Sequence, residues 1–179
     1  LIITTSHDQL GEGGAQTGVA ASEFTAPYYE FVDHGLEVDI ASIEGGPVPI
    51  DPLTMSWFIR HHYDDRYLAD AEMKAKVANS LRIDDVDFTE YDVIFLAGGW
   101  GASYDLAQSP VLGEKVTDAW AAGKVVGGVC HGPLGLLQAK DEDGRPLVEG
   151  RKVTAVTDKQ VRELGISVTP MHPEHELRE

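Results

Sequence analysis

The residues best suited to chemistry lie at positions 128–132, with the sequence GVCHG. This G-x-C-x-G pattern is the cysteine form of the nucleophile elbow, in which the flanking glycines allow a sharp, strained turn. The turn would lift the sulfur of Cys130 above a sheet. Pro133 suits the first turn of a following helix, so we expect Cys130 at a helix N-terminus, where partial positive charge favours the thiolate. The alternative is a buried structural thiol.

Two side chains could serve Cys130 as a base or as an orienting group. His131 follows it directly, but adjacent side chains usually point apart, so a histidine merely beside the turn is the alternative. Glu23 lies on the predicted first helix. Near the elbow it could accept a hydrogen bond from the thiol, with its pKa raised by burial and by a neighbouring thiolate. The alternative for Glu23 is a surface glutamate.

A glycine-rich loop, Gly98-Gly99-Trp100-Gly101, directly follows a predicted buried strand. Such a loop can aim backbone N–H groups at a developing oxyanion, although glycine-rich turns are often only turns. It is not a phosphate-binding loop, because the G-x-x-x-x-G-K-[ST] pattern is missing.

Other histidines offer a weaker signal. His172 and His175 are three residues apart with Glu174 between them, a spacing that could hold a metal ion. A polar surface segment is the simpler interpretation, so we expect no metal ion and no organic cofactor.

The hydrophobic pattern predicts alternating strands and helices around these residues. Pro27 is expected to kink or split the first helix. The predicted strands are 1–5, 36–42, 92–97, 124–129 and 152–156, with a further short run at 166–169, and the predicted helices are 19–34, 109–122 and 134–139.

This alternation predicts one α/β domain over residues 1–179, built as a three-layer, doubly wound, mostly parallel sheet. Residues 53–90 separate two strands by more chain than a simple strand–helix–strand unit needs. They read as mostly helical, with Asp70 as an N-cap, and we expect a lid insertion covering one end of the sheet. In such sheets the ligand site lies beyond the carboxyl ends of the strands, where the elbow and the glycine loop both begin.

Composition limits the classes of function. Thirty acidic and 14 basic residues give a net charge of −16, which argues against nucleic acid as a partner because phosphate neutralisation needs clustered Lys and Arg. No stretch approaches the ~20 apolar residues of a membrane helix. A single cysteine cannot form an intramolecular disulfide, so we expect a cytoplasmic protein. The acidity fits either a high-salt habitat or an ordinary acidic enzyme.

Taken together, these motifs resemble those of the DJ-1/PfpI superfamily, and within it the Hsp31-like branch, whose fold is flavodoxin-like and related to class I glutamine amidotransferases. The resemblance covers nearly the whole chain, and segment 53–90 looks like the lid of that branch. It rests on TGVAASEFTAPY (17–28), EVDIAS (37–42), DVIFLAGGWGA (92–102), VVGGVCHGP (125–133) and GRPLVEGRKVT (144–154).

The resemblance implies roles for particular residues. Cys130 matches the family nucleophile, His131 its partner, and Glu23 the glutamate that contacts the cysteine. Gly99 and the backbone around His131 match the oxyanion-binding region, with Trp100 at a position where family members often have histidine. The resemblance also implies a homodimer.

The family's third, acidic residue usually follows the strand after the elbow. The matching stretch here is VTDKQV (156–161), which places Gln160 or Val161 at the expected position. Asp158 and Glu163 are the nearest acids that could replace it.

For function, the resemblance implies a cysteine-dependent, cofactor-independent enzyme acting on small reactive carbonyls. The expected reaction is of the glyoxalase III type, a lyase reaction that converts methylglyoxal to D-lactate. Two alternatives stay open: a redox-sensing or chaperone-like stress protein that uses the same cysteine, and a hydrolase or hydratase acting on peptides or isonitriles at the same elbow.

Overall fold

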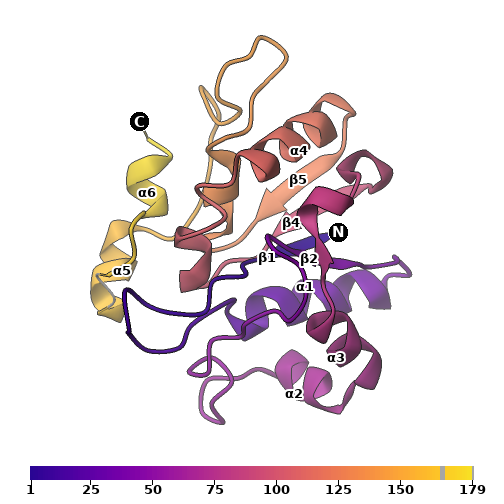
Figure 1. Cartoon of the computed structure of the whole chain (residues 1–179), viewed down its shortest axis with the longest axis vertical. Coiled ribbons are helices and arrows are strands. Elements are labelled where there is room, and N and C mark those ends of the chain that lie inside the picture. Colours follow the sequence, from indigo (N-terminus) through magenta and orange to yellow (C-terminus); the bar gives the residue numbers. More distant parts are fainter. Residues whose placement is uncertain (166–167, 179) are drawn as a thin grey trace.

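A computed structural model describes residues 1–165 and 168–178 of the chain. Within these ranges a central sheet has the strand order β3-β2-β1-β4-β5, and every neighbouring pair is parallel (Figure 1). The strands are β1 (Ile2–Thr4), β2 (Ile40–Ser42), β3 (Leu81–Arg82), β4 (Val93–Leu96) and β5 (Val125–Gly128).

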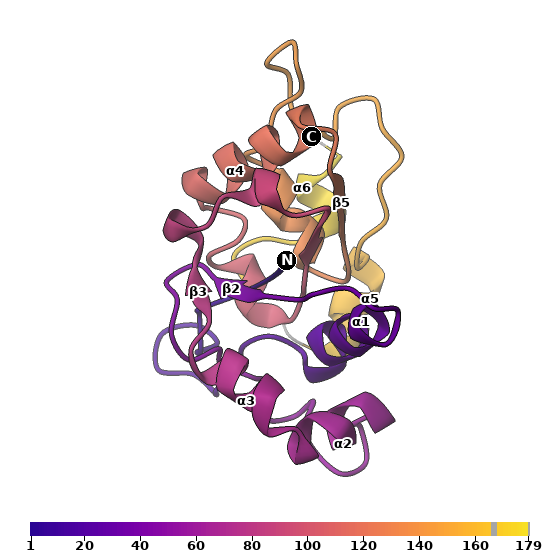
Figure 2. The same ribbon diagram turned by 90° about the vertical axis from the view of Figure 1, so that its right-hand side faces the viewer.

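Helices flank this sheet, as the two orthogonal views show (Figures 1 and 2). The α-helices are α1 (Ala21–Asp33), α2 (His62–Ala69), α3 (Ala71–Ala78), α4 (Pro110–Ala121), α5 (Asp158–Leu164) and α6 (Pro173–Glu176). Short 3₁₀ helices are η1 (Ile83–Asp85), η2 (Phe88–Glu90), η3 (Trp100–Ser103) and η4 (Gly132–Leu136). None of the helices in the described ranges combines the length and the apolar character needed to span a bilayer.

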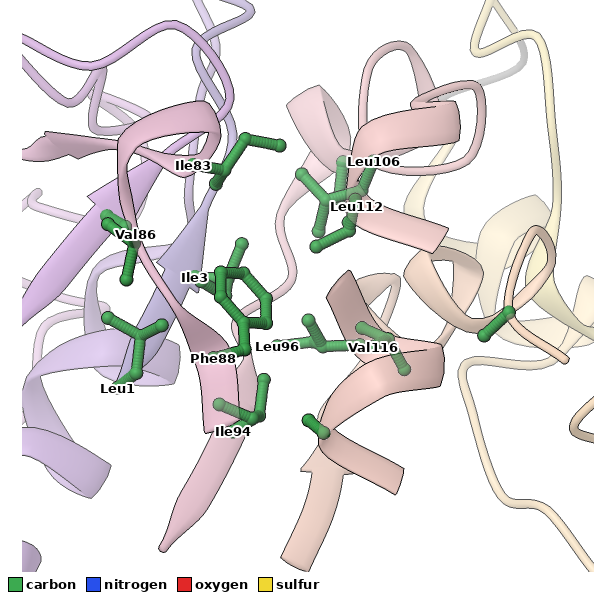
Figure 3. Packing of buried hydrophobic residues seen from close by; sticks show 14 of the residues in the cluster. Leu1, Ile3, Ile83, Val86, Phe88, Ile94, Leu96, Leu106, Leu112 and Val116 are labelled. Carbon is green, nitrogen blue, oxygen red and sulfur yellow. The ribbon is translucent and has the colours of Figure 1, made fainter. Parts of the chain in front are cut away.

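Successive residues of a strand point to opposite faces, and β1 therefore contributes to two cores. Ile3 packs in one cluster with Leu96 of β4 and with Leu112 and Val116 of α4 (Figure 3). Ile2 packs in the other cluster, whose members include Phe24 of α1 and Met73 and Val77 of α3. The predicted three-layer, doubly wound, mostly parallel α/β fold is confirmed.

The strand order fixes where a site can form. The chain leaves β1 for β2 on one side and later returns to β4 on the other, so the strand order reverses at the carboxyl ends of β1 and β4, where ligands of such sheets usually bind. The loop after β4 carries Gly98 to Gly101, and the elbow follows β5 beside it. Both predicted loops therefore lie at this end of the sheet.

The helix predicted at 19–34 is present as α1, but Pro27 does not split it. Phe24, Tyr28 and Tyr29, on both sides of the proline, are buried against the sheet layer. This packing holds the two halves in one helix although Pro27 lacks the N–H that would bond to Glu23.

Segment 53–90 contains the expected helices α2 and α3, and Asp70 caps α3 by accepting hydrogen bonds from the N–H groups of Glu72 and Met73. The same segment also supplies β3, which the sequence pattern did not predict. With two residues, both exposed, β3 is too short to show a strand periodicity.

Other boundaries differ from prediction. The strand expected at 36–42 shortens to β2, and the helix expected at 134–139 is the 3₁₀ helix η4. The strand expected at 152–156 is wrong: this stretch has no regular secondary structure and joins no strand of the described sheet. It meets the elbow through the hydrogen bond from Val156 N–H to the Cys130 carbonyl. The short run predicted at 166–169 falls partly outside the described residues.

Candidate active site

Cys130 occupies the strained turn that its sequence predicts. Its φ of +56° is the only positive φ of a non-glycine residue in the described part of the chain, and such a conformation disfavours an L side chain. The flanking glycines are required by the nearby β4 strand. A Cβ atom on Gly132 would lie 2.0 Å from the carbonyl oxygen of Leu96, and one on Gly128 would lie 2.9 Å from the same oxygen.

Backbone hydrogen bonds hold the turn from both sides. Val129 N–H donates to the Leu96 carbonyl over 3.1 Å, which ties the elbow to β4. Val156 N–H donates to the Cys130 carbonyl, also over 3.1 Å. The nucleophile candidate is thus presented by a fixed backbone, and its strained φ is maintained by the surrounding structure.

Glu23 reaches the elbow from the first turn of α1. The glycines after β4 make this approach possible: a Cβ atom on Gly98 would lie 2.3 Å from Glu23 Oε2 and 2.8 Å from the Cβ of Cys130. Gly99 has a φ of +93°, and a Cβ there would lie 2.5 Å from the backbone nitrogen of Ala20. The Gly98-Gly99 pair is therefore where α1 and the elbow meet most closely.

The structure brings Glu23 and Cys130 into contact. The Cys130 side chain and the N–H groups of Gly98 and Gly99 all act on the Glu23 carboxyl and lower its pKa, although burial raises it by more. Its second oxygen, Oε2, is buried and has no partner among the described residues. A carboxyl group next to a thiol, with one oxygen left free, can exchange a proton with the sulfur or with a bound molecule.

The contact changes the acidity of both groups. Burial raises the pKa of Glu23 to about 7, and burial together with the Glu23 charge raises the pKa of Cys130 to about 12. Between about pH 7 and pH 12 the pair therefore holds one proton, which these pKa values place on the Cys130 thiol beside the Glu23 carboxylate.

This corrects the expectation that a helix N-terminus lowers the pKa of Cys130. The following element, η4, is a 3₁₀ helix of five residues, too short for a strong macrodipole. The N–H groups of Gly99 and His131 do favour the thiolate, but burial and the Glu23 charge outweigh them.

His131 lies beside the sulfur rather than pointing away. Its Nδ1 is 3.3 Å from Cys130 Sγ, and its ring centroid is 4.9 Å from that of Trp100 at an interplanar angle of 53°. The residue is buried, with 1% exposure. Burial lowers the pKa of His131 to about 4, so the imidazole is neutral near pH 7.

The two predicted oxyanion donors converge on the sulfur. The backbone N–H groups of Gly99 and His131 both act on the Cys130 side chain and lower the pKa of its thiol. A carbonyl carbon attacked by the sulfur would place its oxygen near these donors, which is the arrangement of an oxyanion hole. Trp100 begins η3, and its ring packs at a tilt against that of His131.

Neither candidate for the third acid reaches His131. Asp158 starts α5, and its backbone N–H donates to the Glu174 carboxylate. Glu163 is exposed and pairs with Lys159 at 3.7 Å. Instead, the ionisable group that acts on His131 is His172, which after burial is the second cause of the lowered His131 pKa. The sequence singled out His172 only as half of a possible metal pair, because no local pattern links it to the elbow.

An open groove of about 580 Å³ lies next to the elbow. Its lining is mostly apolar and comes from the elbow, from the stretch before α5 and from α5 itself, with Cys130, Val129, Val156 and Leu164 among the lining residues. In the described part of the chain, no three His, Cys, Asp or Glu side chains are grouped so that they could hold a metal ion.

Comparison with known proteins finds relatives along nearly the whole chain. A glutathione-independent glyoxalase of Saccharomyces cerevisiae is 30% identical over 171 residues, which cover 93% of this chain and 71% of that protein. The crystal structure of glyoxalase III from Candida albicans superposes with a TM-score of 0.81 at 25% identity, over 98% of this chain and 78% of that one.

The Rapid Encystment Protein of Francisella tularensis superposes with a TM-score of 0.92 at 36% identity, over 99% of this chain and 78% of that one. Residues 15–169 match the model of the DJ-1/PfpI family, a range that includes Glu23, the glycine loop and the elbow. The chain therefore belongs to the DJ-1/PfpI family, and its relatives there include glutathione-independent glyoxalases.

Proposed function

We propose that this protein is a cysteine-dependent glyoxalase of the glyoxalase III type, which converts methylglyoxal to D-lactate without glutathione or another cofactor. The observation that carries the proposal is the contact between the Glu23 carboxyl and the Cys130 thiol on a strained elbow. The names of the yeast and Candida relatives support the choice of a small dicarbonyl as substrate.

In the first step the sulfur of Cys130 bonds to the aldehyde carbon of methylglyoxal. The thiol proton passes to the Glu23 carboxylate, and the carbonyl π electrons move onto oxygen to give an alkoxide. The N–H groups of Gly99 and His131 stabilise this oxyanion, because both already favour negative charge on the sulfur beside it. Glu23 then returns the proton to that oxygen, which gives the neutral hemithioacetal and restores the carboxylate.

In the second step a proton moves from the former aldehyde carbon to the neighbouring carbon through an enediol, which yields a lactate thioester. Water then hydrolyses the thioester, releasing lactate and restoring the thiol. Glu23 is the better base for the proton transfer, because its pKa of about 7 matches neutral pH while the His131 pKa of about 4 makes the imidazole a weak base.

The same pKa values argue against a dedicated redox sensor. A sensing cysteine is typically a low-pKa, solvent-accessible thiolate, whereas burial and Glu23 raise the pKa of Cys130. The sulfur here shares its proton with a carboxyl group. That arrangement suits addition to an electrophile that can itself become protonated.

Segment 53–90 belongs to the proposal as a lid. The chain leading into it is tied to the start of α1, since Ala21 N–H donates to Thr54 Oγ1 over 3.0 Å and Thr17 donates to the buried Asp51 carboxylate over 2.9 Å. Beyond these ties, Trp57 and Phe58 are 81% and 65% exposed. An exposed apolar loop beside the helix that carries Glu23 is suited to covering a bound substrate.

The test is turnover of methylglyoxal in the absence of glutathione, followed by loss of dicarbonyl and by enantiomer-specific detection of lactate. We expect wild-type protein to form D-lactate, and Cys130→Ala and Cys130→Ser to form none above background. Equal rates for wild type and Cys130→Ala would overturn the proposal. Peptide and isonitrile substrates, tested alongside, separate hydrolase or hydratase chemistry at the same elbow.

A further inference from the structure

Two buried imidazole nitrogens near the elbow have no hydrogen-bond partner in residues 1–165 and 168–178: His131 Nε2 and His172 Nδ1. A buried polar nitrogen without a partner lowers the stability of the folded protein by about 1–3 kcal/mol. Two such nitrogens close together therefore indicate that a hydrogen-bonded contact joins them in the working protein. The Nδ1 atom of His131 is already engaged by Cys130 Sγ at 3.3 Å.

Packing fixes α6, which begins directly after His172, against the helix η4 that follows the elbow. Tyr104, just after η3, donates from its hydroxyl to the Val168 carbonyl over 3.1 Å. Glu174 of α6 accepts from Asp158 N–H over 2.7 Å, and α6 packs against η4 and α5. The segment that carries His172 is therefore fixed to the elements around His131: His172 directly precedes α6, His131 directly precedes η4, and these two helices are in contact.

Resting on the proposed function, we propose that His172 is a positioning residue that takes the place of the missing third acid. His172 Nδ1 accepts a hydrogen bond from His131 Nε2–H through one bridging water molecule. This selects the His131 tautomer whose Nδ1 is free to accept a hydrogen bond from the Cys130 thiol.

An imidazole in this place has a different effect from a carboxylate. A carboxylate would stabilise an imidazolium and draw the thiol proton onto His131. A neutral imidazole fixes the orientation of His131 but does not favour its protonation, and this leaves Glu23 as the group that takes the thiol proton. The chain thus has Gln160 where the family resemblance expects an acid, and His172 takes over as the partner of His131.

The test compares His172→Leu, which removes the acceptor, with His172→Asn, whose side-chain oxygen can replace it. Histidine ¹⁵N chemical shifts report the tautomer of His131, and we expect protonation at Nε2 in wild type and in His172→Asn, and a mixture of tautomers in His172→Leu. We expect kcat for methylglyoxal to fall about tenfold in His172→Leu with little change in KM, in line with the loss of one hydrogen bond, and to recover in His172→Asn. His34→Leu, on an exposed histidine at the end of α1, is the matched control.

An unchanged His131 tautomer in His172→Leu would overturn the proposal. Equal loss in the Leu and Asn variants would also overturn it, since that pattern indicates a structural role. A larger loss in Asp158→Asn or Glu163→Gln than in His172→Leu would assign the third position to that acid. The tautomer measurement needs no substrate, so it decides the role of His172 even if methylglyoxal proves not to be the substrate.

Discussion

The Glu23 carboxyl and the Cys130 thiol are in contact, one at the start of α1 and the other on the elbow after β5, and burial raises the pKa of both. Their closeness depends on Gly98, where any Cβ would collide with both side chains. A pair that retains one proton over the neutral range can supply a nucleophilic sulfur and, in the same step, a place for its proton.

Replacing Glu23 by Gln should remove the proton acceptor while keeping the size of the side chain. We expect kcat/KM for methylglyoxal to fall by about 10²–10⁴-fold, the usual contribution of general acid–base catalysis. The measurement is initial-rate kinetics at fixed pH. Glu30→Gln, on an exposed residue of the same helix, should keep wild-type activity, and a similar loss in both variants would speak against a specific role for Glu23.

The raised pKa of Glu23 also makes a prediction about stability. The folded protein holds this proton up to about pH 7, whereas the unfolded chain releases it near pH 4.5. The protonated Glu23 carboxyl therefore makes its full contribution to the free energy of unfolding below pH 4.5, and this contribution is lost as pH rises to about 7. The free energy of unfolding of Glu23→Gln, relative to wild type, should increase by about 3 kcal/mol across this window.

Chemical denaturation at pH 4.5, 6 and 8 measures this difference. His131 contributes with the opposite sign, since its lowered pKa gives stability that is present above pH 6.5 and is lost as pH falls towards 4. Because His131 is present in both proteins, its contribution cancels in the comparison. A difference that stays constant with pH would contradict the raised pKa of Glu23.

Substitution by alanine should have different effects on stability at Gly132 of the elbow and at Gly127 of β5. A Cβ on Gly132 would lie 2.0 Å from the Leu96 carbonyl oxygen, whereas one on Gly127 would meet no atom within 4 Å. We expect Gly132→Ala to destabilise the protein by about 1–3 kcal/mol or more through overpacking, and Gly127→Ala to be close to neutral. Thermal unfolding of the two variants measures this, and equal effects would contradict the described turn.

The sequence predicted those features of the site that depend on local constraints. The G-x-C-x-G spacing indicated a strained turn because glycine is needed wherever another backbone approaches closely, and Cys130 has the expected positive φ. The alternation of apolar strands with amphipathic helices predicted the layers. The association of Glu23 with the elbow came from the family resemblance, since no local pattern joins residues so far apart.

Features that depend on burial in three dimensions were not predictable. The direction of the Cys130 pKa shift depends on how deeply the sulfur is buried and on the nearby carboxyl charge, and the elbow motif predicts neither of them. Similarly, the apolar and β-branched character of residues 152–156 predicted a strand, but a strand also needs a partner, and this stretch joins none in the described sheet. His172 reaches His131 only through the packing of α6 on η4.

The most direct test of the shared proton is the rate of Cys130 alkylation by iodoacetamide as a function of pH, measured in wild type and in Glu23→Gln. The protein has one cysteine, so intact mass reports this residue alone. We expect the wild-type rate to rise through a step near pH 7, where the pair passes to its singly protonated form, and the variant to lack that step. Identical pH profiles in the two proteins would contradict a proton shared between Glu23 and Cys130.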